Sequence, residues 1–142
     1  MTLLNEAAET DQGLEDYLKA DATLTAMVSG IWSTYTGRKS EGMPIVRFFQ
    51  VETDDLMNIS GGRVWTEIVY QVDAVDRGLD TTAVRAISQR VDQLLHLLRG
   101  QTFGNVLVEE VYRRAPLFRR EIEGDQPYVY SGGEYVFHVS TP

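Results

Sequence analysis

Residues 64–76 constrain the fold most strongly, because their side chains alternate between two chemically different faces. One face is apolar or β-branched and carries Val64, Thr66, Ile68, Tyr70, Val72 and Ala74. The other mixes charged, polar and apolar side chains, namely Trp65, Glu67, Val69, Gln71 and Asp73. A period of two residues is typical of a β-strand with one face on a hydrophobic core. The segment therefore predicts a long strand in a sheet.

An amphipathic helix is expected after this strand, over residues 80–99. Its apolar positions recur at helical spacing and form one stripe, made by Val84, Ile87, Val91, Leu94, Leu95 and Leu98. Asp80 is suited to cap the start of the helix, and Gly100 is suited to end it in the left-handed conformation that glycine accepts.

The segments before residue 64 predict a helix followed by two strands. The helix spans residues 11–29, with Asp11 as its N-cap and a possible restart as a second short helix at Asp21. Residues 31–36 and 43–52 follow as strands, because β-branched and aromatic side chains dominate them.

Two further strands are expected after the second helix, at residues 106–114 and 128–140. Between them, residues 116–126 are polar and begin with a proline, which predicts an exposed connection. The pair Gly132 and Gly133 predicts a bulge or a tight turn in the last strand.

The order helix, three strands, helix, two strands predicts an α+β fold. We expect a single domain over residues 1–142 with a mainly antiparallel sheet of about five strands and two or three helices packed on one face. A chain of 142 residues is close to the commonest size of one domain, so one core is expected.

The composition excludes several classes of protein. The chain has no cysteine, which rules out disulfides, thiolate zinc sites and thiol redox chemistry. Its apolar runs are far shorter than the roughly 18 residues that a membrane-spanning helix needs. The acidic residues 1–11 also lack the pattern of a secretion signal, so we expect a cytoplasmic protein without a membrane contact.

The formal net charge of −8 argues against a protein that grips nucleic acid. Binding along a phosphate backbone needs clustered Lys and Arg side chains that release counterions. The same charge is compatible with a surface past which DNA slides, because like charges repel and prevent sticking.

The sequence predicts no catalytic, cofactor-binding or metal-binding residue. Neither His96 nor His138 has a serine or carboxylate at a spacing that suggests a triad. The acidic residues Asp73, Asp76 and Asp80 are each explained separately by a strand end, a turn and a helix cap. A small hydrolase that uses one histidine with this acidic turn remains an alternative.

Two segments are candidates for contacts with other proteins. Residues 53–63 predict a hairpin tip or an extended arm that carries Leu56, Met57 and Ile59. Residues 113–120 form a basic island in an otherwise acidic chain, with the arginines Arg113, Arg114, Arg119 and Arg120. Arginine is favoured at subunit contacts, although a solvated strand end would explain the island equally well.

The order of elements resembles the tail-completion, or tail-terminator, proteins of long-tailed phages. The likeness rests on five segments that together cover nearly the whole chain. These are LEDYLKADATLTAMVSGIW at residues 14–32, MPIVRFFQVE at 43–52, WTEIVYQVDAVD at 65–76, LLHLLRG at 94–100 and EYVFHVS at 134–140. The long polar stretch between residues 113 and 134 departs from the family pattern, where a tighter connection is expected.

This resemblance implies a structural virion protein that forms a hexameric ring on the finished tail tube. The ring ends tube polymerisation and joins the connector of the filled head, while genomic DNA passes through its channel without specific binding. Its partners would be other copies of itself, the tail tube protein and the head connector or neck protein, and the family brings no catalytic residues. We further expect an acidic or neutral channel wall, because the chain is negatively charged.

Two other assignments remain open at this point. A head-side neck or connector adaptor has the same general pattern as a tail terminator. A dimeric small-molecule-binding α+β module would need a sizeable apolar pocket between helix and sheet, where we expect ordinary packing.

Overall fold

The computed structural model describes residues 5–33, 42–57 and 63–141. Its helices are α1 (Glu6–Lys19), α2 (Ala22–Thr25) and α3 (Thr82–Leu95). Its strands are β1 (Gly30–Ser33), β2 (Ile45–Met57), β3 (Arg63–Arg77), β4 (Gln101–Phe103), β5 (Val106–Glu123) and β6 (Gln126–Ser140).

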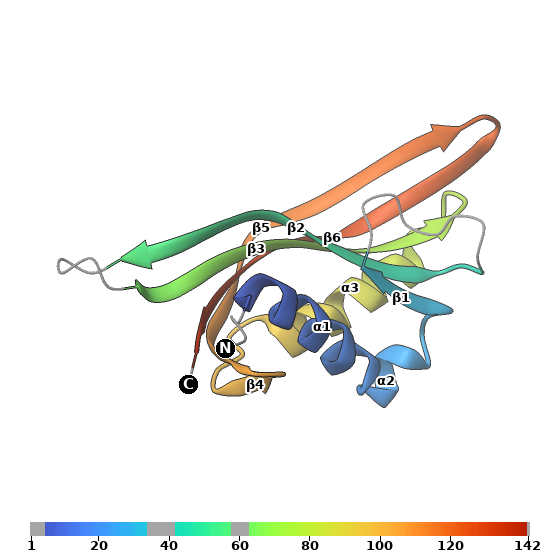
Figure 1. Ribbon diagram of the computed structural model, residues 1–142. Helices are drawn as coiled ribbons and strands as arrows, with labels where there is room; N and C mark the ends of the chain where they lie inside the picture. Colours follow the sequence, from blue (N-terminus) through green and yellow to red (C-terminus); the bar gives the residue numbers. More distant parts are fainter. Residues whose placement is uncertain (1–4, 34–41, 58–62, 142) are drawn as a thin grey trace.

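The strands form one sheet in the order β1-β2-β3-β6-β5-β4, which curls around the helices into a half-barrel (Figure 1). Only the edge pair β1–β2 is parallel among the described strands, and the other pairs are antiparallel. The expected α+β fold with helices on one face of a mainly antiparallel sheet agrees with this arrangement. The sheet is larger than expected, because the described residues form six strands with a parallel edge.

The hydrophobic core lies between the helices and the concave face of the sheet. The alternation predicted for β3 is confirmed, since Ile68, Tyr70, Val72 and Ala74 all point into this core. Helices α1 and α3 supply the opposite layer, with Leu14, Leu18, Val84, Ile87, Val91 and Leu95 buried. Apolar residues at a period of two therefore meet apolar residues at a helical period across one interface.

The first helix begins earlier than the sequence predicted. Asn5 is its N-cap and accepts a hydrogen bond from the backbone N–H of Ala8 at 3.0 Å. Asp11, the predicted cap, lies inside α1, where its carboxylate accepts hydrogen bonds from the hydroxyls of Ser33 and Tyr70. The restart at Asp21 is confirmed, because its carboxylate caps α2 by accepting from Leu24 N–H at 2.8 Å.

The third helix ends earlier than predicted, at Leu95 and not at residue 99. The N-cap of α3 is Thr81, one residue after the predicted Asp80. The carboxylate of Asp80 accepts hydrogen bonds from the N–H and the hydroxyl of Thr82. Leu97 adopts a positive φ of 69°, which turns the chain away from the helix before Gly100. The chain then lies beside β5. There the Leu97 N–H donates to the Val111 carbonyl, and the Val111 N–H donates to the Leu98 carbonyl. This pairing satisfies backbone groups that a longer helix would have used internally.

The largest difference from the sequence prediction lies at residues 116–126. They are not a loose connection but the outer half of a long β5–β6 hairpin. The hairpin turns at Gly124 and Asp125, where Gly124 has a positive φ of 59°, as expected at the first position of a type II′ turn. The predicted bulge at Gly132 and Gly133 is also absent, because the register breaks of this described strand pair fall in β5, near residues 109 and 114.

None of the helices in the described residues is long and apolar enough to span a membrane.

Candidate assembly interface

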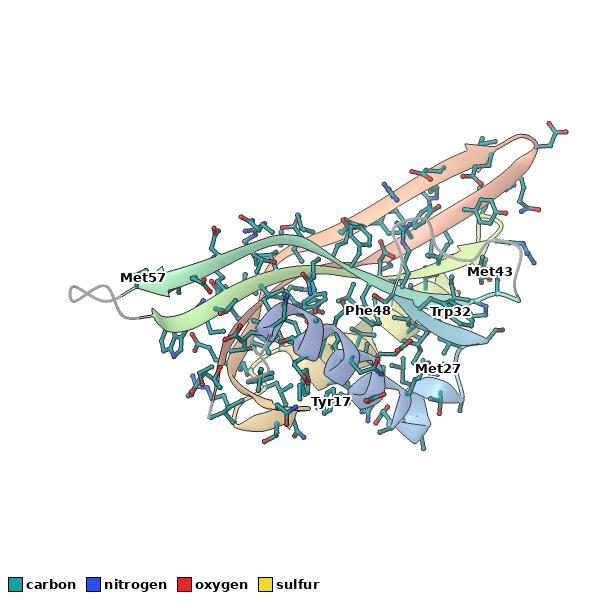
Figure 2. The ribbon with its side chains drawn as sticks, viewed as in Figure 1. Tyr17, Met27, Trp32, Met43, Phe48 and Met57 are labelled. Atoms are coloured by element: carbon teal, nitrogen blue, oxygen red, sulfur yellow. The ribbon has the colours of Figure 1, made fainter. Side chains whose placement is uncertain are left out.

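The paired end of β2 and start of β3 form one end of the sheet, which we call the β2–β3 arm and define as residues 52–57 and 65–69 (Figure 1). Strand β6 pairs with β3 on its other side from Thr66 to Val69, so β2 is the outer strand of the arm. Leu56 is half-buried opposite Trp65. Met57 lies at the end of the arm (Figure 2) and is 59% exposed. Ile59, the third apolar residue of the predicted contact, lies outside the described residues.

The arm is rich in carboxylates. Asp55 accepts a hydrogen bond from the hydroxyl of Thr66 at 2.9 Å, and Glu67 contacts His138 Nε2 at 3.0 Å. Glu52 pairs with Arg114 at 2.9 Å. Asp54 is exposed and makes no ion pair with any described residue. The arm therefore combines an exposed apolar end with an unneutralised negative charge.

The second projection is the β5–β6 hairpin, defined as residues 115–134, which points away from the β2–β3 arm on the other side of the molecule (Figure 1). The structure places Arg119 and Arg120 on this hairpin, with Arg113 and Arg114 at its base. The predicted basic island is thus spread along one strand and not gathered in a loop.

Three of the four arginines are already paired within the chain. Arg113 lies 3.8 Å from Asp92 of α3, and Arg119 lies 3.3 Å from Glu121. Arg114 bonds Glu134 and Glu52. Arg120 rests over the ring of Phe118 at 5.2 Å and makes no ion pair with any described residue. Most arginines of the island therefore form ion pairs within the chain, whereas the charge of Arg120 is available to another partner.

Arg114 links three strands of the sheet. Its guanidinium donates to Glu134 on β6 at 2.6 Å and to Glu52 on β2 at 2.9 Å. These carboxylates, Glu134 first, raise the pKa of Arg114, and they hold the charge in place at the register break of β5. The base of the hairpin is fixed to the root of the β2–β3 arm by this contact.

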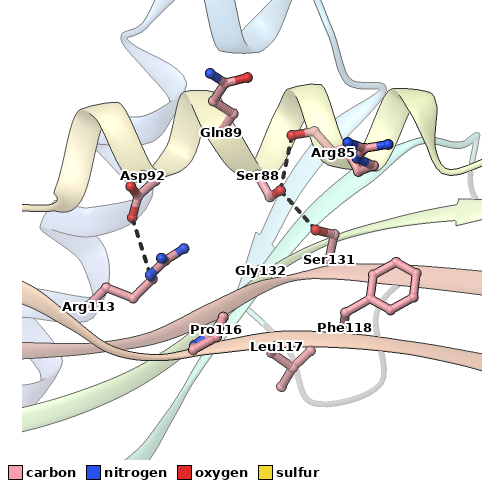
Figure 3. A pocket seen from close by; sticks show the side chains of 10 residues that line it. All are labelled: Arg85, Ser88, Gln89, Asp92, Arg113, Pro116, Leu117, Phe118, Ser131 and Gly132. Atoms are coloured by element: carbon pink, nitrogen blue, oxygen red, sulfur yellow. Dashed lines mark hydrogen bonds and ion pairs between the residues drawn. The ribbon is translucent and has the colours of Figure 1, made fainter.

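A groove of about 450 Å³ lies between α3 and the β5–β6 hairpin (Figure 3). Arg85 and Gln89 of α3 line one wall, and Pro116, Leu117 and Phe118 of β5 line the other. The hydroxyls of Ser88 and Ser131 meet at 2.9 Å across its floor. The groove is an open surface feature outside the packed core, so it does not supply the enclosed apolar pocket that a small-molecule-binding module would need.

The sequence prediction missed the apolar surface of this hairpin. Phe118 is 52% exposed and Ile122 is 74% exposed, and both lie on the side of the sheet that carries the helices. A signal for the hairpin was present, because Gly124-Asp125 is a two-residue turn sequence between segments that can pair. Five charged residues among residues 119–125 concealed the strand character of this segment.

Both histidines have structural partners. The Nδ1 and Nε2 atoms of His138 lie 2.9 Å and 3.0 Å from Glu110 and Glu67, and its ring stacks on Trp65 with centroids 5.0 Å apart. His96 Nδ1 accepts the backbone N–H of Arg113 at 3.1 Å. Each histidine bridges neighbouring elements, and neither is poised beside a nucleophile that the structure describes.

The acidic residues considered for a metal site are held apart by separate partners. Asp73 is buried against Arg47 at 2.7 Å, Asp76 accepts the N–H of Arg77, and Asp80 holds the start of α3. Among the described residues, no group of three or more His, Asp or Glu side chains is placed to hold a metal ion.

The fold is similar to that of a chain in the virion of a native gene transfer agent (GTA) particle. The two superpose with a TM-score of 0.74 at 13% sequence identity, over 94% of this chain and 97% of that chain. A second solved structure has a TM-score of 0.50 at 16% identity, over 92% of both chains. No protein-family model and no curated protein matches the sequence. At these identities the likeness establishes the fold alone.

Proposed function

We propose that this chain is a structural protein of a tailed-phage-type virion, located at the head-proximal end of the tail. The observation that carries the proposal is the likeness of almost the whole fold to a chain of the GTA virion, at a TM-score of 0.74. A virion protein of this kind acts by occupying a place in an assembly, and it requires contact surfaces more than a catalytic centre.

The specific role is that of a tail terminator. The chain forms a ring, hexameric in this proposal, that caps the tail tube, ends its polymerisation and provides the surface to which the head connector or neck protein joins. Genomic DNA passes through the channel of the ring without being bound. The protein is made in the host cytoplasm and ends in the virion.

The two projections support a ring. The β2–β3 arm and the β5–β6 hairpin extend from opposite sides of the body, so each copy offers two different surfaces in two directions (Figure 1). Contacts between unlike surfaces are heterologous, and they close into a ring when the rotation between copies is suitable.

A non-enzymatic role is part of the proposal. It is supported by the separate structural partners of His96, His138 and Asp73, which leave these candidate groups engaged in packing and pairing.

Deletion of the gene in its particle-producing host tests the role directly. Loss of a tail terminator gives overlong tails, because tube polymerisation no longer stops. Tails of normal length that are detached from heads would reject the tail-terminator role and favour a head-side neck adaptor. Normal joined particles would reject both. Complementation with the intact gene must restore normal particles.

A further inference from the structure

The groove between α3 and the β5–β6 hairpin has an unsatisfied positive charge. Arg85 is exposed on the helical wall, and Arg120 is exposed on the hairpin. Neither guanidinium makes an ion pair with any residue that the structure describes. Phe118 lines the groove with Arg85, contacts Arg120 and is 52% exposed. Asp92 and Arg113 also line the groove and lie 3.8 Å apart as an ion pair. The groove thus combines an exposed ring with the cation of Arg85, and Arg120 lies next to it over Phe118, which suits a partner that has apolar and acidic groups together.

The β2–β3 arm has the complementary character. Asp54 and Leu56 lie two residues apart on one strand and therefore point to the same face. Asp54 makes no ion pair within the described part of the chain, and Met57 beside them is 59% exposed. Strand β2 is the outer strand here, because β1 pairs only with residues 45–48 in the described part of the chain, so the edge of β2 at the arm can enter an open groove.

The end of the arm and the β5–β6 hairpin of one chain extend in opposite directions (Figure 1), so the arm of a chain does not reach Phe118 in its own groove. Two grooves facing each other in an isologous dimer would bring Arg85 and Arg120 of one copy against the same cations of the other, which like-charge repulsion disfavours. Charge complementarity therefore selects a second copy that offers its arm to the groove.

We propose that the β2–β3 arm of one copy occupies the groove between α3 and the β5–β6 hairpin of the next copy. Leu56 packs against Phe118, and Asp54, on the same face of β2, pairs with Arg85 and Arg120. This inference deepens the proposed ring, on which it rests, by naming the contact that joins its subunits. Each copy donates one arm and accepts one, which is the arrangement a closed ring requires.

Cross-linking is a direct test, because the chain contains no native cysteine. We would mix a Met57→Cys chain with a Gln89→Cys chain and treat the mixture with a short bifunctional maleimide. The expected product is a dimer in the mixture and little product from either variant alone. A chain that carries both substitutions should give a ladder that ends at the size of the ring.

A matched control uses Thr23→Cys, on the exposed surface of α2, in place of Gln89→Cys. This pair should give no dimer. The proposal is overturned if the Thr23 mixture cross-links equally well, or if no cross-link forms at protein concentrations where the wild-type chain self-associates. It is also overturned if the wild-type chain stays monomeric at every concentration and on tail tubes.

Charge reversal provides a second, independent test. Asp54→Arg alone, or Arg85→Glu with Arg120→Glu, should weaken self-association at least tenfold, as measured by analytical ultracentrifugation. An equimolar mixture of the two variants should associate again, because each arm then meets an oppositely charged groove. A mixture as dissociated as its components would overturn the pairing. Unchanged thermal unfolding of each variant confirms that the exposed substitutions leave the fold intact.

The contact and the proposed function can fail separately. Overlong tails on gene deletion, together with negative cross-linking, would keep the tail-terminator role and reject this contact. Positive cross-linking with tails of normal length would keep the contact and reject the role in tail termination.

Discussion

Gly132 occupies a position where β6 approaches β3 too closely for any side chain. A Cβ atom at this residue would overlap the carbonyl oxygen of Val72 and the backbone of Asp73. The neighbouring atoms are backbone in a central strand pair, so they cannot move aside as a flexible side chain would. The sequence predicts a bulge or turn at this glycine, whereas the structure requires it for close packing of two continuous strands.

We therefore predict that Gly132→Ala lowers the free energy of unfolding by about 3 kcal/mol, the upper end of the cost of overpacking. Urea denaturation followed by circular dichroism measures the change. Gly42→Ala is the matched control, because among the described residues a Cβ there would meet the side chain of Ser29 alone, at 3.3 Å from its Oγ. The control should change stability by less than about 0.5 kcal/mol. Equal effects of the two substitutions would show that steric overlap at Gly132 is not the cause.

The ion pair between Arg47 and Asp73 is the second residue-scale constraint. The two side chains are 4% and 0% exposed, and the Arg47 guanidinium also lies over the ring of Tyr130 at 4.9 Å. Gln71 donates a further hydrogen bond to Asp73 at 2.9 Å. A buried charge that loses its partner keeps its desolvation cost without the compensating attraction.

Asp73→Ala is accordingly expected to destabilise the fold by about 3–5 kcal/mol, the range for breaking a buried pair from one side. The double variant Asp73→Leu with Arg47→Met removes both charges and should cost less than the single substitution. Urea denaturation of the three proteins gives the comparison. A double variant less stable than Asp73→Ala would mean that the uncompensated charge of Arg47 is not the main cause of the lost stability.

At the scale of elements, Asp21 ties α2 to α3. Its carboxylate caps α2 and forms two hydrogen bonds with Arg90 of α3, at 2.7 Å and 3.0 Å. The hydrogen bond from Arg90 is the main reason that the pKa of Asp21 is lowered, and the bond from Leu24 N–H acts in the same direction. A carboxyl group with a lowered folded pKa stabilises the native state above its unfolded pKa of about 4, and this contribution disappears as the pH falls through the folded value.

Two substitutions separate the cap from the ion pair. Asp21→Asn keeps a good N-cap and loses the charge, so it should cost up to about 1 kcal/mol at pH 7. Asp21→Ala loses both and should cost about 1 kcal/mol more. Below about pH 4 the difference between wild type and Asp21→Asn should shrink, because the wild-type carboxyl becomes protonated. A difference that stays constant from pH 7 to pH 3 would rule out this ionic contribution.

The elements that could be predicted from the sequence are those with an unbroken period. Strand β3 keeps an apolar side chain at every second position from Ile68 to Ala74, and the apolar stripe of α3 faces one layer, so both follow from local pattern. The end of α3 could not be found this way, because residue 97 leaves the helix to pair with β5, a contact distant in sequence. The strand β4, with only three residues, is too short to give a pattern.

The candidate interface was predictable only in part. The arm was predicted as a hairpin tip or extended arm with apolar residues on it, although the sequence did not reveal that β2 continues to Met57 as a paired strand. The arginines were found from composition, but their partners Asp92, Glu52 and Glu134 come from other elements. The groove depends on the distance between α3 and the hairpin, which no local pattern of residues encodes.

At the scale of the whole molecule, the distribution of charge determines how strongly a ring of this chain would bind DNA. The net charge is −8, and Arg113, Arg114 and Arg119 are paired with carboxylates of the same chain. A paired arginine releases few counterions when it approaches a phosphate, because its charge is already compensated. In the proposed contact, Arg85 and Arg120 would also be neutralised by the next subunit.

The assembled protein should therefore bind duplex DNA more weakly than about 10⁻⁴ M at physiological salt, the weak limit of ordinary non-specific binding. Fluorescence anisotropy of a labelled duplex, titrated with the protein, measures this. Replacing Glu15 and Asp16 of α1, which lie outside the proposed contact, with lysine changes the charge by about +4 per chain and should produce measurable binding that weakens as salt is raised. Tight, salt-sensitive binding by the wild-type protein would instead require an arginine-lined channel, and it would contradict a ring through which DNA passes without being held.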